Sequence, residues 1–237
     1  MRRVLELRDM MIDTYFNHFE KKILISHFKH GTSLLTDTLK NNGRWIFHKT
    51  NIENLGYEPI EDAIQAMSPR YKDYKKYMTW RPVDESFISA FCYEMRTGLS
   101  NFVVDETQTA EEYENILRAW IELAGGPDKV MNRFLTKTIH RNGTFMSIFY
   151  PVLNHDTAFN LVDHIDQIIL LPNLKKFLTD HDTTPPEGIS NQTKKQILDI
   201  TERVFNDLGM LDLLAKLTPE TYKYKELLRQ KPLYDTP

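Results

Sequence analysis

The fold prediction starts from one stretch, Lys22-Ile23-Leu24-Ile25-Ser26-His27-Phe28-Lys29-His30-Gly31-Thr32-Ser33. Its apolar start is typical of a strand that is buried on both faces of a parallel sheet. A short loop with a glycine follows, and we expect a helix from about Ser33 to the Asn42-Gly43 pair, which favours a helix end. A strand, a glycine loop and a helix together cradle anions, because loop N–H groups and the helix N-terminus carry positive potential.

Strands and helices alternate outward from this stretch, which predicts βαβ units and a parallel sheet with helices on its faces. Further strands are expected at 44–48, 76–80 and 165–171, and further helices at 1–20, 59–67, 84–95, 109–124, 127–139, 190–208 and 210–217. The helix at 1–20 is predicted from apolar residues at helical spacing. The expected fold class is therefore α/β: a three-layer α/β/α arrangement with a central parallel sheet, a P-loop-like phosphate loop and a mostly helical C-terminal half.

Composition excludes several classes of function. The chain has 237 residues and a formal net charge of −3, so a general nucleic-acid binder is not expected. No continuous apolar stretch reaches the length of a membrane span, and the N-terminus is a poor signal peptide, so the expected location is cytoplasmic without membrane association. The one cysteine, Cys92, excludes an internal disulfide and lies in an apolar run. No spacing of His, Asp and Glu predicts a metal site, and no feature indicates the oligomeric state.

The phosphate loop is not a Walker A loop, which requires G-x-x-x-x-G-K-[ST]. Its lysine, Lys29, comes before the glycine, Gly31, and the loop is shorter. This argues against an ATPase or a nucleoside or nucleotide kinase, although a P-loop kinase stays as the alternative enzyme. A non-catalytic binding module on the same fold is a second alternative.

The pattern Lys29-x-Gly31-Thr32-Ser33 resembles the 5′-phosphosulfate loop of sulfotransferases that use 3′-phosphoadenosine 5′-phosphosulfate (PAPS). In that family an Arg at the end of a later strand and a Ser eight residues on bind the 3′-phosphate. Here Trp80-Arg81-Pro82-Val83-Asp84-Glu85-Ser86-Phe87-Ile88-Ser89 places Arg81 and Ser89 at that spacing. The segment from Asp166 resembles carbohydrate-type members more loosely, since Pro172 stands where their pattern has Glu.

The resemblance implies transfer of a sulfuryl group from PAPS to a hydroxyl or amine on a small molecule or glycan, with 3′,5′-bisphosphoadenosine as the product and no metal. It implies that Lys29 neutralises charge on the leaving phosphate. It further implies that the donor is bound by the following residues: Lys29, His30, Gly31, Thr32, Ser33, Arg81 and Ser89. The resemblance covers 22–100 well and 160–214 loosely.

A general base is also expected, because the acceptor must lose a proton. His48, at the end of the second predicted strand, and Glu53, at a spacing that resembles glycan-type relatives, are the two main candidates. The remaining candidates are Glu58, Glu61 and His155. We interpret 1–237 as a single sulfotransferase-like domain, with a donor-binding core at 22–100, acceptor-side helices and loops at 101–160 and a C-terminal strand and helices at 161–217.

Overall fold

A mixed sheet of five strands, in the order β3-β1-β2-β4-β7, organises the protein. The computed structural model describes residues 12–27, 29–39, 42–48, 66–96, 109–136, 138–141, 144–147, 161–181, 183 and 192–234. The strands are β1 (Ile12–Asn17), β2 (Lys22–His27), β3 (Trp45–His48), β4 (Lys75–Trp80) and β7 (Gln167–Leu170). β2, β4 and β7 pair in parallel, and β1 is antiparallel to both β2 and β3. Four of the five strands therefore point the same way, so the expectation of an α/β fold with a mostly parallel sheet is confirmed.

The helix predicted over 1–20 is wrong where the structure describes it. Ile12–Asn17 form β1, and a turn carries the chain into β2; residues 1–11 lie outside the described residues. Tyr15 and Phe16 are both buried, although they point to opposite faces of a strand, whereas Phe19 is 86% exposed. The helical spacing of Tyr15 and Phe19 was therefore coincidental. The segment forms a strand because β2 and β3 pair with its two edges, while Tyr15 and Phe16 pack into the apolar clusters on opposite faces of the sheet.

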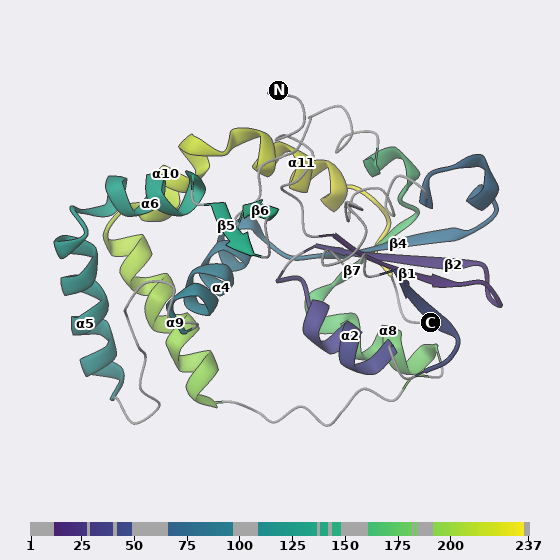
Figure 1. The fold of residues 1–237 in the computed structure, drawn as a ribbon, viewed down its shortest axis with the longest axis horizontal. Helices are drawn as coiled ribbons and strands as arrows, with labels where there is room; N and C mark the ends of the chain where they lie inside the picture. Colours follow the sequence, from purple (N-terminus) through teal and green to yellow (C-terminus); the bar gives the residue numbers. More distant parts are fainter. Residues whose placement is uncertain are drawn as a thin grey trace.

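Helices cover both faces of the sheet (Figure 1). α2 (Thr32–Leu39) and α8 (Leu174–Asp180) pack on one face, where Leu35 and Phe177 contact a cluster that includes Leu24. α11 (Pro219–Arg229) and the 161–165 segment pack on the other face, in a cluster that includes Ile23 and Ile25. Alternate residues of β2 thus enter opposite cores, which is why Ile23, Leu24 and Ile25 are all apolar.

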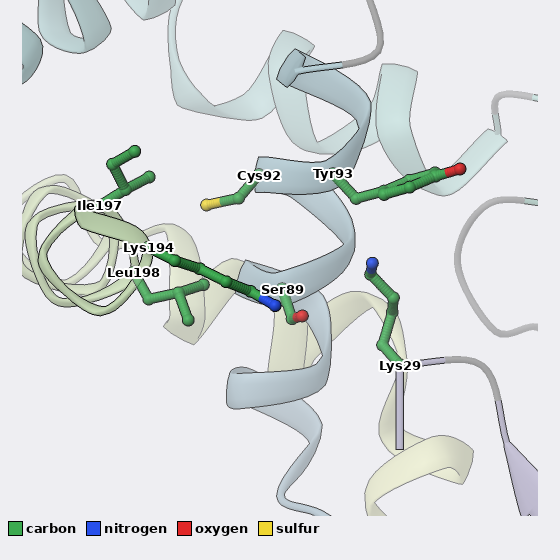
Figure 2. A pocket seen from close by; sticks show the side chains of 7 residues that line it. All are labelled: Lys29, Ser89, Cys92, Tyr93, Lys194, Ile197 and Leu198. Atoms are coloured by element: carbon green, nitrogen blue, oxygen red, sulfur yellow. The ribbon is translucent and has the colours of Figure 1, made fainter. Parts of the chain in front are cut away.

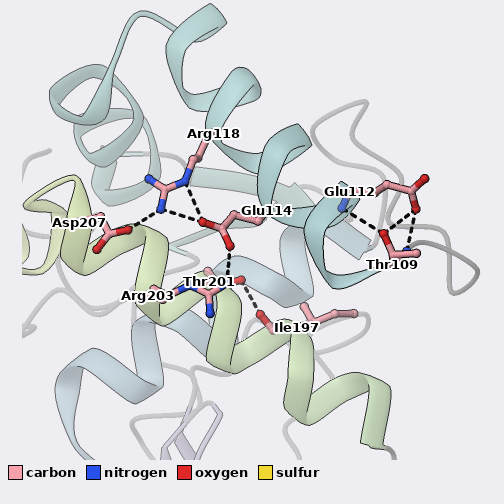
Figure 3. Close-up of polar contacts among 8 residues, drawn as sticks. All are labelled: Thr109, Glu112, Glu114, Arg118, Ile197, Thr201, Arg203 and Asp207. Carbon is pink, nitrogen blue, oxygen red and sulfur yellow. Dashed lines mark hydrogen bonds and ion pairs between the residues drawn. The ribbon is translucent and has the colours of Figure 1, made fainter.

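A third apolar core lies beside the sheet and is built from helices (Figure 1). Its helices are α4 (Val83–Arg96), α5 (Ala110–Leu123), α6 (Pro127–Thr136), α9 (Gln192–Asp207) and α10 (Met210–Leu217). Phe87, Phe91 and Phe205 pack together at its centre. α5 and α9 are also joined at the surface, where Glu114 binds Arg118 and Arg203 and where Arg118 binds Asp207 (Figure 3). This packing fixes α9 relative to α4.

Most predicted helices of the second half are present, with shifted ends. The helix expected over 127–139 ends at Thr136, and β5 (Thr138–Arg141) follows it and pairs with β6 (Thr144–Ser147). α2 ends at Leu39, before the expected Asn42-Gly43 pair. Of the helix expected over 59–67, only Ala66 and Met67 are described. Short 3-10 turns occur at Pro69–Tyr71 and Leu171–Asn173. None of the described helices has the length and apolar character to cross a membrane.

Candidate functional site

The loop between β2 and α2 makes a tight left-handed turn. Lys29 has φ 63° and Gly31 has φ 88°, both in the region that favours glycine. Gly31 also packs closely on the 3-10 turn and α8 behind it, since a Cβ there would lie 2.5 Å from Leu174 Cδ2. The N–H of His30 donates to the carbonyl of His27 at 3.0 Å. Thr32 and Ser33 are the first two residues of α2, and their side chains lie outside the described residues.

Arg81 connects the end of β4 to this loop. Its Nη1 donates to the carbonyl oxygen of Lys29 at 3.2 Å, and its Nε donates to Glu85 Oε2 at 3.1 Å. β2 and β4 are parallel neighbours, so their carboxyl ends lie at the same edge of the sheet. The structure therefore brings together the two predicted phosphate elements, which are 52 residues apart at this contact.

A cavity of about 350 Å³ lies between the loop, α4 and α9 (Figure 2). It is lined by Lys29, Ser89, Cys92, Tyr93, Lys194, Ile197 and Leu198. Among these described lining residues two are lysines and none is acidic, so the cavity combines cationic groups with an apolar wall. The Lys29 ammonium lies 4.0 Å from the centroid of the Tyr93 ring, a cation–π contact that keeps the charge at the edge of the cavity. Arg81 is not among the described lining residues, and its contact is with the main chain of the loop at Lys29.

Of the seven described lining residues, only Lys29 and Ser89 were predicted as site residues, and the other five were not. Lys194 and the Ile197–Leu198 wall come from α9, more than 100 residues after Ser89. Figure 2 shows the Lys194 side chain extending from α9 toward Ser89. A lysine in the first turn of an amphipathic helix carries no signal that separates it from a solvated one, so only the packing of α9 on α4 reveals it.

A buried polar cluster lies next to the loop, and sequence reasoning missed most of it. His27 Nε2 is 3.0 Å from the Tyr224 hydroxyl, and His30 Nε2 is 2.9 Å from Ser86 Oγ and 2.8 Å from Lys225 Nζ. Burial lowers the pKa of both histidines well below the usual range, and the charge of Lys225 lowers the pKa of each further. Both rings are therefore neutral at pH 7. His30 was predicted to bind PAPS, and its ring points into this buried cluster.

The candidate bases are not brought to the cavity by the described structure. His48 is the last residue of β3, which is separated from β2 by β1; strands two positions apart lie roughly 10 Å from each other. The side chain of His48 lies outside the described residues, as do Glu53, Glu58, Glu61 and His155 entirely. Within the described ranges no three side chains of His, Cys, Asp or Glu gather in a way that could hold a metal ion.

Comparison of this chain with known proteins finds no match among protein-family models, curated proteins or solved structures. The function is therefore argued from the geometry of the loop, of Arg81 and of the cavity.

Proposed function

We propose that the chain is a PAPS-dependent sulfotransferase with a P-loop-like, three-layer fold. One observation carries the proposal: Lys29 and Ser89, each predicted to contact the donor, line the same cavity, and Arg81 contacts the Lys29 carbonyl at its side. A chance pattern in the sequence would not be expected to collect residues from a loop, a strand end and a helix at one place. The cavity and the carboxyl edge of the sheet are also where ligands bind in open α/β folds.

In this proposal the 5′-phosphosulfate of the donor lies against the loop and the start of α2. The acceptor oxygen or nitrogen attacks sulfur, the bond from sulfur to the bridging oxygen breaks, and 3′,5′-bisphosphoadenosine leaves with the electron pair. The acceptor proton passes to a general base, for which His48 and Glu53 stay the two main candidates. Lys29 stabilises the charge that develops on the bridging oxygen, a role that acts mainly in the transition state.

The wall of the cavity has a polar, cationic part and an apolar part, which suit different parts of the ligands. Lys29, Ser89 and Lys194 offer groups that bind anions, whereas Cys92, Ile197 and Leu198 form an apolar wall. An acceptor or a nucleobase with an apolar face would remove that wall from water, which favours binding by roughly 25 cal/mol per Å² of apolar surface buried.

The first experiment compares ligands by thermal shift. 3′,5′-Bisphosphoadenosine should raise the unfolding temperature of the wild type more than ADP does, because only a ligand that binds the folded state stabilises it. A larger shift with ADP and Mg²⁺ would favour the kinase instead. Binding of 3′,5′-bisphosphoadenosine without sulfuryl transfer to a panel of phenols, amines and glycans would indicate a non-catalytic module.

The second experiment tests Lys29 by single-turnover transfer at saturating PAPS. Lys29→Ala should lower the rate by a factor of about 100–1,000 and lower donor affinity much less, because several N–H groups share the ground-state phosphate. Lys72→Ala, at an exposed turn before β4, is the matched control and should keep the wild-type rate. A Lys29→Ala rate within about threefold of the wild type would remove Lys29 from the catalytic machinery.

A further inference from the structure

The C-terminal helix α11 places a buried lysine between the two predicted phosphate elements. Lys225 is 3% exposed, and its Nζ is 2.8 Å from His30 Nε2 and donates to the carbonyl oxygen of Arg81 at 3.1 Å. His30 belongs to the loop after β2, and Arg81 follows β4. The Lys225 side chain therefore contacts both predicted phosphate elements, the loop after β2 and the end of β4.

Further contacts fix the position of Lys225. The Trp80 indole N–H donates to the carbonyl oxygen of Lys225 at 3.1 Å, which joins the main chain of α11 to the end of β4. The neighbouring Tyr224 hydroxyl is 3.0 Å from His27 Nε2, at the end of β2. The α11 backbone is thus held at the end of β4 and the Tyr224 side chain at the end of β2, which together fix the part of α11 that carries Lys225.

Burying a lysine is costly unless its polar head is hydrogen-bonded. Burial lowers the pKa of Lys225 well below its usual range, and the positive charge of Arg81 lowers that pKa further. An apolar side chain of the same length would fill the space without this cost. The polar head is therefore best explained by its contacts with His30 and with the Arg81 carbonyl.

We propose that Lys225 is a positioning residue that holds the loop at 29–33 and the Arg81 end of β4 at the separation that the two phosphate groups of the donor require. This inference rests on the proposed function for the identity of the donor. The bridge between the two elements is a property of the protein alone and can be tested without ligand.

The test uses Lys225→Met, which keeps the unbranched stem and removes the polar head. Lys223→Met is the matched control, because Lys223 lies on the same helix with its side chain 63% exposed. Amide hydrogen exchange should rise about tenfold or more at 29–33 in Lys225→Met, since losing a buried hydrogen bond costs about one power of ten in a local equilibrium. Exchange in α5 and α9 should stay unchanged in both variants.

A spectroscopic readout separates positioning from general destabilisation. The ¹⁵N shifts of the His30 ring report which nitrogen carries the proton, and they respond to the partners of Nε2, which are Lys225 Nζ and Ser86 Oγ. The shifts should change in Lys225→Met and not in Lys223→Met. In the wild type, a cross-peak between the Lys225 side chain and the His30 ring tests the same contact, so a variant that fails to fold does not prevent the test.

The third measurement compares the affinities of the variants for 3′,5′-bisphosphoadenosine and AMP. Lys225→Met should weaken 3′,5′-bisphosphoadenosine about tenfold, and AMP less, because only the first ligand needs both elements. Unchanged loop exchange with unchanged ring shifts, or no cross-peak in the wild type, would overturn the role of Lys225. A wild type that shows the Lys225 contacts with His30 and Arg81 but does not bind 3′,5′-bisphosphoadenosine would overturn the assignment of PAPS as donor. The positioning role of Lys225 would then be retained.

Discussion

Gly31 meets two separate requirements at a single position. Its φ of 88° is left-handed, and its Cα faces the fully buried Leu174 so closely that a Cβ would lie 2.5 Å from Cδ2. The left-handed φ is required by the turn of the loop, and the absence of a Cβ is required by the packing of α8 against the loop. Gly43, with φ 69° and no atom within 4 Å of a built Cβ, has only the first. The two glycines therefore form a matched pair.

Gly31→Ala should destabilise the protein more than Gly43→Ala. A left-handed alanine costs about 1–2 kcal/mol, and both variants bear this cost. Gly31→Ala should lose at least about 1 kcal/mol more, because Leu174 must move within a packed core. Urea unfolding followed by circular dichroism measures the difference. Equal losses would show that α8 yields without cost and that the loop does not depend on it.

Arg81 makes contacts that suggest two effects of its removal. Arg81→Ala deletes the bond to the Lys29 carbonyl, so it should weaken every ligand of the loop to some degree. In the proposed function it should weaken 3′,5′-bisphosphoadenosine more than adenosine 5′-phosphosulfate, because the latter lacks the 3′-phosphate. A charge-assisted contact contributes about 1.5–3 kcal/mol, which corresponds to about 10- to 150-fold in affinity. Calorimetry that shows the same loss for both ligands would exclude 3′-phosphate recognition by Arg81.

The packing of α9 against α4 creates one wall of the cavity. Ile197 and Leu198 form its apolar part, and Lys194 lies one turn earlier on the same helix. The ion pairs of Glu114 with Arg203 and of Arg118 with Asp207 join α9 to α5 further along. Neutralising a lysine at the wall changes the potential inside the cavity, whereas the same change on another exposed helix face does not.

Lys194→Met should weaken binding of 3′,5′-bisphosphoadenosine by about tenfold, the effect of one charged contact to a phosphate. Lys216→Met, on α10, is the control with the same chemical change and should bind as the wild type does. Titration calorimetry at two salt concentrations adds a second readout, because screening should reduce the effect of Lys194. An affinity for Lys194→Met equal to that of the control would place the anion elsewhere.

Three titratable side chains, those of His27, His30 and Lys225, lie together in the interior where the sheet, α4 and α11 join. Burial keeps His27 and His30 neutral by lowering the pKa of each well below the ordinary histidine value of 6.5. The unfolded chain still binds protons at that value. Below about pH 6.5 the unfolded state therefore holds more protons than the folded state, so stability is lost as pH falls. Lys225, whose pKa is also lowered, acts in the same direction at higher pH.

Stability should fall on acidification from pH 6.5 toward pH 5, before the carboxylates titrate. Each histidine contributes a slope of up to about 1.4 kcal/mol per pH unit in this window. Urea unfolding at several pH values gives the slope, and His30→Gln should reduce it by up to about 1.4 kcal/mol per pH unit. A wild-type profile that is flat between pH 6.5 and pH 5 would mean that these rings accept protons in the folded state.

Much of the architecture follows from local sequence patterns. β2, β3, β4 and α4 were predicted close to their observed bounds, because apolar runs and helical periodicity are properties of neighbouring residues. The same patterns placed the loop of Lys29 and Gly31 and the strand end of Arg81 at the carboxyl edge of the sheet. The donor and the reaction stay predictions, since they follow from resemblance.

The three-dimensional packing decided the rest. Residues 12–17 form β1 rather than a helix because two neighbouring strands pair with its edges and distant segments cover its two faces, which no local period reveals. Lys194 and Lys225 read as ordinary helical lysines, yet one lines the cavity and the other is buried between His30 and Arg81. Periodicity identifies which face of an element is apolar. The contacts made across that face depend on which distant elements pack there, and those contacts set the burial, charge and hydrogen bonding of the site.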